Sequence, residues 1–195
     1  MESHFFAMMS RMKYIERWAL MRNSRSENIA EHSLEVSMIS HALAVISNRR
    51  FGNRLNTEKA ALIALYHDST EIITGDMPTP IKYYNKEIKG AFKEIETIAA
   101  NTLLDMLPED MKEEYYSIFF KKEDEEYLWQ LVKAADKLSA LIKCIQEEKA
   151  GNTEFMSAKN SLIEALDEMN LPEVEVFRTE YLPSYEKSLD EINKL

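Results

Sequence analysis

Apolar residues recur along most of the chain at the three- and four-residue spacing of an α-helix. One such series is Leu34, Met38, Ala42 and Val45, and a longer one is Leu128, Leu131, Val132, Ala135, Leu138, Ile142 and Ile145. No segment alternates apolar and polar residues as a half-buried strand does. The pattern therefore predicts an all-α fold.

Glycine and proline mark the breaks between these periodic segments. The chain has only four glycines and five prolines, and two of the prolines, Pro78 and Pro80, stiffen a predicted loop over residues 74–84. The remaining segments are predicted to be helices near residues 4–18, 31–48, 57–74, 84–106, 109–121, 124–149, 153–169 and 173–193.

Length and composition narrow the picture further. A chain of 195 residues predicts a single domain over residues 1–195, arranged as a helical bundle. The net charge of -10 disfavours a nucleic acid polymer as partner, because binding one requires many phosphates to be neutralised. No run approaches the about 18 apolar residues of a membrane span, and the single cysteine, Cys144, fits a reducing compartment. We therefore expect a cytoplasmic protein without a membrane partner.

Chemically active side chains gather where the helix predicted over residues 57–74 ends. His67 and Asp68 follow the apolar run of residues 61–66, and Glu71 comes one turn later. On a continuous helix, His67 and Glu71 would lie about 40° apart, with Asp68 on the adjoining side. This spacing predicts that the three side chains face one cleft.

Two more polar residues lie on or beside apolar stripes of other predicted helices. His32 is in line with Val36, Ile39 and Leu43, and Asp136 follows Val132 by four positions. A buried carboxylate needs a cation nearby, which favours a metal site. Simpler interpretations stay open at this stage. His32 could be a hydrogen-bonded core residue, Asp136 could pair with Lys133 or Lys137, and Arg17 could be a surface cation over the ring of Trp18.

The order of His32, His67-Asp68 and Asp136 resembles the metal-binding motif of the HD-domain phosphohydrolases, an all-α superfamily. Longer stretches resemble the bacterial 5'-deoxynucleotidases within it. These stretches are SHFFAMMSRMKYIERWALMRN, RSENIAEHSLEVSMISHALA, ALYHDSTEIITGDMPTPIKYYN and LVKAADKLSALIKC. The resemblance covers most of the chain and is weakest around residues 109–127 and after Gly151.

The resemblance implies a role for each matching residue. The metal ligands would be His32, His67, Asp68 and Asp136. Such a set suits Co²⁺ or Mn²⁺, with Cu²⁺ and Zn²⁺ as alternatives. The implied catalytic residues are Glu71, which handles the attacking water, and Arg17, which orients the phosphate. The residues implied to contact substrate are Arg17, Trp18, His32, Asp68, Asp76, Met77, Pro78, Thr79 and Asp136.

The activity that the resemblance implies is metal-dependent hydrolysis of 2'-deoxyribonucleoside 5'-monophosphates by a metal-activated water. Trp18 would disfavour a 2'-hydroxyl, no motif indicates selection of the base, and the family implies a homodimer. Two alternatives remain. One is another HD phosphohydrolase, acting on a cyclic nucleotide or a guanosine polyphosphate. The other is a helical regulatory module with a degenerate site.

Overall fold

The computed structural model describes residues 2–82 and 84–193, so Tyr83 of the predicted loop and both extreme ends of the predicted domain lie outside the described residues. Within that part of the chain every regular element is helical, and the prediction of an all-α fold is confirmed. The α-helices are α1 (Phe5–Met9), α2 (Ile29–Arg50), α3 (Thr57–Tyr66), α4 (Glu71–Thr74), α5 (Thr79–Lys82), α6 (Lys86–Leu104), α7 (Glu109–Phe119), α8 (Glu126–Lys149), α9 (Met156–Met169), α10 (Pro172–Glu180) and α11 (Leu189–Ile192). Short 3₁₀ turns are η1 (Ser10–Tyr14), η2 (Glu123–Glu125), η3 (Thr153–Phe155) and η4 (Leu182–Glu186).

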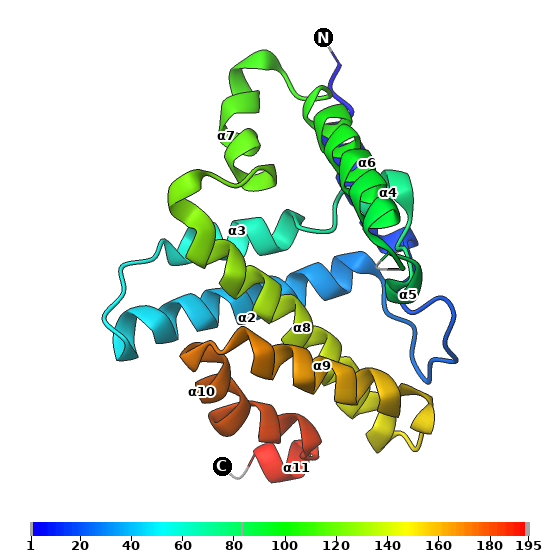
Figure 1. Ribbon diagram of the computed structural model, residues 1–195, viewed down its shortest axis with the longest axis vertical. Helices are drawn as coiled ribbons and strands as arrows, with labels where there is room; N and C mark the ends of the chain where they lie inside the picture. The colour runs from blue at the N-terminus through cyan, green and yellow to red at the C-terminus, as the bar shows by residue number, and fades with distance from the viewer. Residues whose placement is uncertain (1, 83, 194–195) are drawn as a thin grey trace.

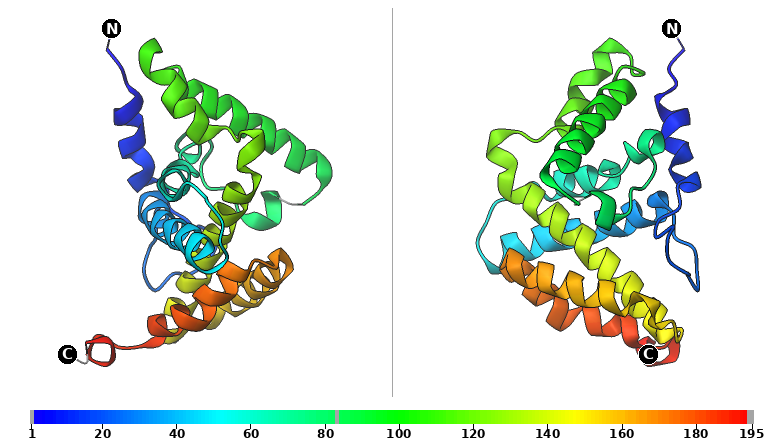
Figure 2. Two further views of the ribbon diagram at one scale, coloured as in Figure 1. Left: turned by 90° about the vertical axis from the view of Figure 1, so that its left-hand side faces the viewer. Right: turned by 45° about the vertical axis from the view of Figure 1, so that its right-hand side comes forward.

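Helices α2 and α8 cross at the centre of the molecule (Figure 1). Helix α3 packs against α2, while α9 and α10 cover the opposite side of this pair, and α6 and α7 form the other end of the molecule (Figures 1 and 2). The main core lies between α2, α3 and α8 and continues to Leu166 and Phe177. A smaller core surrounds Phe5 and Leu103. None of the described helices is long and apolar enough to cross a membrane.

Helix α2 buries the stripe that contains His32. Asn28 caps the helix by accepting hydrogen bonds from the backbone N–H groups of Ala30 and Glu31. Val36, Ile39 and Leu43 are buried, whereas Leu34 and Met38, from the other apolar series, are 56% and 59% exposed. The face that carries the imidazole is therefore the one that enters the core.

Helix α8 is buried on most of its surface because small residues let α2 approach closely. Ala134, Ala135, Ser139 and Ala140 are all buried. This close approach brings Ser139 within hydrogen-bonding distance of His32. The crossing of α2 and α8 thus fixes the relation between two segments that are far apart in the sequence.

The predicted helix over residues 4–18 is shorter than expected, and Arg17 and Trp18 lie in a loop. The helical turns end at Tyr14, and Ile15 is extended. The following backbone pairs with the chain just before α2: Arg17 N–H donates to the Glu27 carbonyl, and Ile29 N–H donates to the Ile15 carbonyl. Because the Arg17 N–H bonds to the chain before α2, it makes no hydrogen bond that would continue the N-terminal helical turns.

The helix predicted over residues 57–74 is interrupted, so the helical-wheel angle inferred for His67 and Glu71 is wrong. Helix α3 ends at Tyr66, residues 67–70 form turns, and α4 begins at Glu71. The His67 ring and the Ser69 hydroxyl bond to the carbonyls of Ala64 and Tyr66 at 2.6 Å each. Such local side-chain bonds compete with helical hydrogen bonds.

The other differences are smaller. The predicted loop over residues 74–84 contains the short helix α5, and the predicted helix over residues 173–193 divides into α10, η4 and α11. Pro183 has no N–H to continue α10, and Ser188 starts α11 with a capping box. Elsewhere the predicted boundaries are right to within a few residues.

The loop between Trp18 and α2 is fastened to α8 by Glu147. This carboxylate accepts hydrogen bonds from the Ser24 N–H, the Asn152 amide and Lys143, and Lys143 also donates to the Arg25 carbonyl. Glu147 and Lys143 are both buried. Removing one member of such a pair leaves an uncompensated charge in the interior.

We therefore expect Glu147→Ala to lower the free energy of unfolding by about 3 kcal/mol. The corresponding fall in the melting temperature is about 6–12 °C. Burial by itself raises the pKa of Glu147, but hydrogen bonds from Lys143 and Asn152 outweigh it and lower that pKa to about 2. The stabilisation is therefore present above pH about 4.5 and is lost as the pH falls towards 2. Thermal melts of both proteins between pH 7 and pH 3 test this, and equal melting temperatures at pH 7 would contradict it.

Candidate metal and phosphate site

Four of the predicted site residues converge near the crossing of α2 and α8. His32 comes from the first turn of α2, His67 and Asp68 from the turn after α3, and Asp136 from the middle of α8. Ligand atoms of His32, His67 and Asp68 lie within 4.8 Å of one another. Asp136 Oδ1 lies 3.0 Å from His32 Nε2 and 4.0 Å from His67 Nε2. Two imidazoles and two carboxylates therefore share one small volume.

The Nδ1 atom of each imidazole has a protein partner, which leaves Nε2 directed at the carboxylates. His67 Nδ1 lies 2.6 Å from the Ala64 carbonyl oxygen, so Nδ1 carries a proton, and Nε2 is the nitrogen that can offer a lone pair to a cation once it is deprotonated. His67 Nε2 is buried and has no hydrogen-bond partner, since Asp68 Oδ2, at 3.2 Å, does not meet hydrogen-bond geometry. A buried, unpartnered nitrogen among carboxylates fits a metal ligand.

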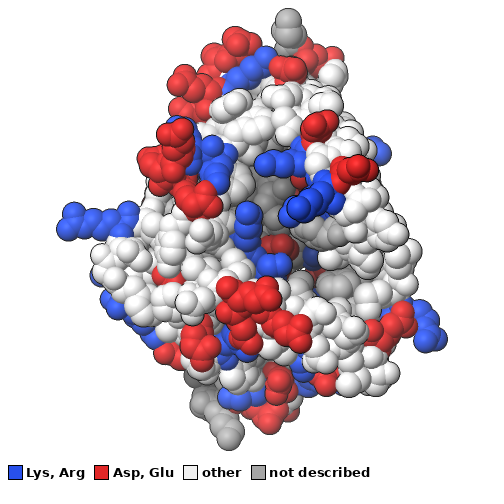
Figure 3. Space-filling view, viewed as in Figure 1, with Lys and Arg blue, Asp and Glu red and all other residues white. Residues whose placement is uncertain are grey.

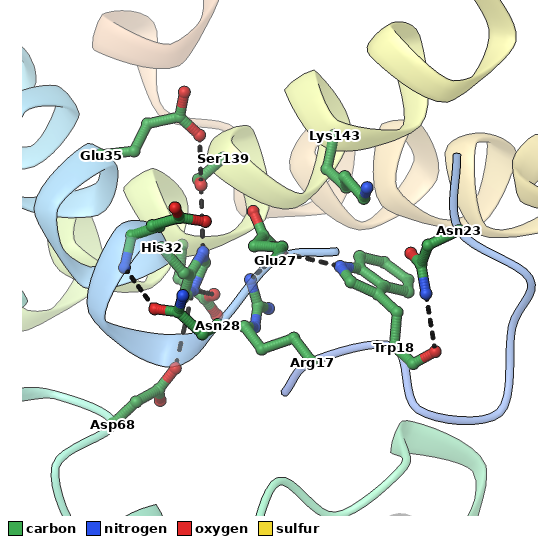
Figure 4. A network of polar contacts seen from close by, with 12 residues as sticks. Arg17, Trp18, Asn23, Glu27, Asn28, His32, Glu35, Asp68, Ser139 and Lys143 are labelled. Atoms are coloured by element: carbon green, nitrogen blue, oxygen red, sulfur yellow. Dashed lines mark hydrogen bonds and ion pairs between the residues drawn. The ribbon is translucent and has the colours of Figure 1, made fainter. Parts of the chain in front are cut away.

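A chain of hydrogen bonds fixes the tautomer of His32 (Figure 4). Ser139 donates its only hydroxyl proton to Glu35 Oε2 at 2.6 Å, so it can only accept from His32 Nδ1, 3.0 Å away. Burial, with the charge of Arg17, lowers the pKa of His32, so the ring is neutral and its Nε2 lone pair faces Asp136 Oδ1. Two lone pairs 3.0 Å apart repel each other unless a cation lies beside both. The donor set fits a divalent cation for this reason.

The charges in this cluster alter its pKa values. Burial alone would lower the pKa of His67, but Asp68 and Asp136 outweigh it and raise that pKa to about 9. Burial would raise the pKa of Asp68, yet His67 beside it holds that carboxyl below its usual range. Without a cation, His67 therefore carries a second proton, on Nε2, at neutral pH.

We expect divalent-cation binding to release this proton. A metal ligand must be a neutral imidazole, so the apparent affinity should rise about tenfold for each pH unit between pH 7 and about 9, and level off above it. Titration calorimetry in two buffers with different ionisation enthalpies should show about one proton released per ion at pH 7. An affinity that does not change from pH 7 to pH 9 would contradict the assignment.

Glu71 lies beside this cluster at the first position of α4. It is buried, and its Oε2 has no hydrogen-bond partner. Burial first, and the charges of Asp68 and Asp76 second, raise the pKa of Glu71 to about 9. An uncommitted carboxyl oxygen with a strongly raised pKa next to a metal-binding cluster is suited to proton transfer.

Arg17 also lies near this cluster. Its Nη1 donates to Glu27 Oε2 at 3.0 Å, and the charges of Asp68, Asp136 and Asp76 also act on it. A guanidinium has five N–H donors, so most of them remain for another ligand. Trp18 follows directly, with its indole against Phe155, and its backbone lies close enough to Asp76 to act on the pKa of that carboxyl, which burial raises overall.

The rest of the segment predicted to contact substrate lies just before α5, at Met77 and Pro78, and at its first residue, Thr79. The Pro78 carbonyl accepts hydrogen bonds from the N–H groups of Ile81 and Lys82, and Thr79 is exposed. Among the residues that the structure describes, no hydrogen bond joins Met77 or Thr79 to the four-residue cluster. Figure 3 shows a hollow in one face of the molecule that is bordered by Lys and Arg side chains as well as by Asp and Glu side chains.

Some residues at the site were not predicted from sequence, namely Glu27, Glu35 and Ser139. Glu35 and Ser139 each lie one helical turn after a predicted ligand, and that spacing could have indicated them. Glu27 had no such signal.

Asp136 has the two imidazoles as its ion-pair partners among the described residues, so the alternative pairing with Lys133 or Lys137 is not observed.

Comparison with known proteins gives consistent matches over nearly the whole chain. The family described as 5'-deoxynucleotidase YfbR-like matches residues 4–185. A 5'-deoxynucleotidase of Vibrio parahaemolyticus is 50% identical over 192 residues, covering 98% of this chain and 99% of that protein. A 5'-deoxynucleotidase of Shewanella oneidensis is 48% identical over 193 residues, covering 99% of each chain.

Solved structures share the fold at lower identity. An HD-domain phosphohydrolase from Listeria innocua superposes with a TM-score of 0.81 at 22% identity, covering 93% of this chain and 88% of that one. An HD phosphohydrolase of cyanophage S-2L, bound to dA and one catalytic Zn²⁺ ion, gives a TM-score of 0.65 at 20% identity and covers 93% and 96% of the two chains. At these identities the likeness establishes the fold alone.

Proposed function

The chain belongs to the YfbR-like 5'-deoxynucleotidase family, and from this premise we propose that it hydrolyses 2'-deoxyribonucleoside 5'-monophosphates to a deoxyribonucleoside and phosphate. We further propose that it prefers deoxyribose to ribose and selects little among bases. The observation that carries the proposal is the convergence of His32, His67, Asp68 and Asp136 beside Arg17. This arrangement supports a cation site next to a phosphate-binding group.

The donor set would hold one divalent cation, and two imidazoles with two carboxylates suit Co²⁺ or Mn²⁺, with Cu²⁺ and Zn²⁺ as alternatives. When bound, such an ion lowers the pKa of a water and offsets negative charge on the phosphate ester. The Glu35–Ser139–His32 chain keeps the ligand nitrogen of His32 unprotonated. The Ala64 carbonyl holds a proton on Nδ1 of His67, so Nε2 is the nitrogen that would bind the cation after losing its own proton.

Glu71 is the residue that we assign to proton transfer. Its pKa of about 9 reflects burial and two neighbouring carboxylates, so added positive charge in the site lowers it and frees the carboxylate to accept a proton. The oxygen of the attacking water forms a bond to phosphorus, the bond from phosphorus to the 5'-oxygen breaks, and the 5'-oxygen takes a proton from solvent or a nearby acid. Glu71 takes the proton of that water. No side chain needs to form a covalent intermediate.

Arg17 and Trp18 are the groups that we assign to the two ends of the substrate. The guanidinium of Arg17 pairs with phosphate oxygens and offsets charge on them as the bond breaks. The indole of Trp18 meets the 2'-carbon of the sugar, where it would leave a ribose hydroxyl unpaired. Asp76, which lies near Arg17 and the backbone of Trp18, accepts a hydrogen bond from a sugar hydroxyl, and Met77, Pro78 and Thr79 also contact the substrate.

Phosphate release from paired deoxyribo- and ribonucleoside 5'-monophosphates tests the proposal. The purified protein is assayed with a chelator and then with Co²⁺, Mn²⁺, Cu²⁺ and Zn²⁺, and the panel includes a cyclic nucleotide and a guanosine polyphosphate. We expect cleavage of dAMP, dGMP and dTMP at similar rates, slower cleavage of AMP, and none with chelator. Equal rates for AMP and dAMP would remove the role of Trp18. Activity on the cyclic nucleotide or the guanosine polyphosphate alone would contradict the proposed substrate and would favour one of these compounds instead.

A further inference from the structure

One carboxylate oxygen holds both side chains that we assign to substrate recognition. Glu27 Oε2 accepts a hydrogen bond from Arg17 Nη1 at 3.0 Å and another from Trp18 Nε1 at 3.0 Å (Figure 4). The Arg17 and Glu27 side chains are only 13% and 14% exposed. The guanidinium and the indole are therefore fixed relative to each other through a single, largely buried acceptor.

The backbone around this carboxylate is fixed as well. Glu16 and Asn28 pair as an isolated antiparallel bridge, and Arg17 N–H donates to the carbonyl of Glu27 itself at 2.8 Å. Trp18 has a φ of 58°, in the left-handed region that bulky residues rarely adopt. Such a conformation persists only where the surroundings determine it, and it turns the indole back towards Glu27.

A purely structural role for Glu27 would be to neutralise the charge of Arg17. That role explains the first hydrogen bond but not the second, because a neutral indole needs an acceptor and not a negative charge. The carboxylates of Asp68, Asp136 and Asp76 are also close enough to act on Arg17, so they offset part of its positive charge. The shared oxygen therefore does more than balance charge.

We propose that Glu27 is a positioning residue that couples recognition of the phosphate to discrimination against a 2'-hydroxyl. This inference rests on the proposed function. A nucleotide whose phosphate is bound by Arg17 presents its sugar at one fixed distance from Trp18. Only an indole that cannot move away excludes the extra hydroxyl of ribose, so selectivity for deoxyribose requires the Glu27–Trp18 hydrogen bond.

The test compares Glu27→Gln with the control Glu31→Gln, an exposed glutamate in the first turn of α2 that pairs with Arg25. For Glu27→Gln we expect the ratio of kcat/KM for dAMP to that for AMP to fall about tenfold, the size of a charge-assisted hydrogen bond. We also expect KM for dAMP to rise more than kcat falls. Glu31→Gln should leave both quantities unchanged.

A second variant tests whether Glu27 acts through the indole. Trp18→Phe retains an aromatic ring but lacks the N–H, so it should lose selectivity much as Glu27→Gln does. In the double variant the ratio should fall no further than in Trp18→Phe alone. Additive losses would overturn the proposal, because Glu27 would then act independently of Trp18.

Fluorescence gives a readout that needs no substrate. Trp129 is the only other tryptophan, so in a Trp129→Phe background acrylamide quenching reports on Trp18 alone. Quenching should increase in Glu27→Gln and remain unchanged in Glu31→Gln. If wild type discriminates between dAMP and AMP and Glu27→Gln discriminates equally well, the role of Glu27 is overturned while the proposed function stands. If wild type does not discriminate, the deoxyribose preference itself fails.

Discussion

Glu71→Gln is expected to reduce phosphate release from dAMP by about 10²- to 10⁴-fold, the usual contribution of a general base. Glutamine has nearly the same size and can still donate and accept hydrogen bonds, but it cannot take a proton from water. Glu71 lies at the start of α4, outside the group of His32, His67 and Asp68 that converges on one point. The variant should therefore bind its divalent cation as wild type does.

Two measurements on the same preparation decide this prediction. Steady-state phosphate release gives the loss of kcat, and elemental analysis after gel filtration gives the metal content per chain. The matched control is Glu94→Gln, an exposed glutamate on α6. A Glu71→Gln protein that has lost both activity and metal would mean that Glu71 is a ligand. A protein that retains both would mean that another group moves the proton.

Asp136→Asn is expected to weaken divalent-cation binding by at least about 100-fold and to abolish turnover with it. Asp136 Oδ1 is the carboxylate oxygen nearest to His32 Nε2 and also lies 4.0 Å from His67 Nε2, so its negative charge faces both imidazoles. Loss of a group outside the ligand set typically costs about 10- to 100-fold in metal affinity, and loss of a charged ligand should exceed that. The amide keeps the shape of the side chain, so the fold should survive.

Titration calorimetry with Mn²⁺ measures this loss directly. Asp105→Asn serves as the control, because Asp105 is an exposed aspartate paired with Lys112 at the end of α6. We expect the control to bind one ion per chain with wild-type affinity. Wild-type affinity in Asp136→Asn would show that the α8 carboxylate is not a ligand and would remove one side of the proposed site.

The sequence alone was sufficient to predict helices because most of them bury a continuous apolar stripe. Helix α8 illustrates this: its stripe from Leu128 to Ile145 is buried almost throughout. The resemblance to the 5'-deoxynucleotidases is likewise confirmed by the family match and by relatives near 50% identity. The helix prediction depends on the local spacing of apolar residues. The family prediction depends on similarity to relatives along nearly the whole chain.

The parts that sequence could not predict arise from bonds between distant segments or from side chains that replace backbone bonds. The break after Tyr66 depends on where the His67 ring and the Ser69 hydroxyl find acceptors. The loop position of Arg17 depends on pairing with the chain around Glu27. Periodicity carries no information about either contact, since each one competes with an otherwise acceptable helix.

The functional site, like the fold, could be predicted from the sequence only in part. His32, His67, Asp68 and Asp136 could be selected as candidates from residue type and resemblance, but their distances depend on how α2 crosses α8. The orientation of His32 depends on Ser139, on the other helix of that crossing. A helical-wheel argument placed His67 and Glu71 on one face for the wrong reason, since a turn and not a helix connects them.

We propose that side chains from three separate segments bind one cation, and anomalous diffraction from a crystal grown with Mn²⁺ or Co²⁺ would locate that ion. We expect one strong peak about 2 Å from Nε2 of both His32 and His67 and from a carboxylate oxygen of Asp68 and of Asp136. A peak bonded to only one of the two imidazoles, or a peak elsewhere with this cluster empty, would contradict it.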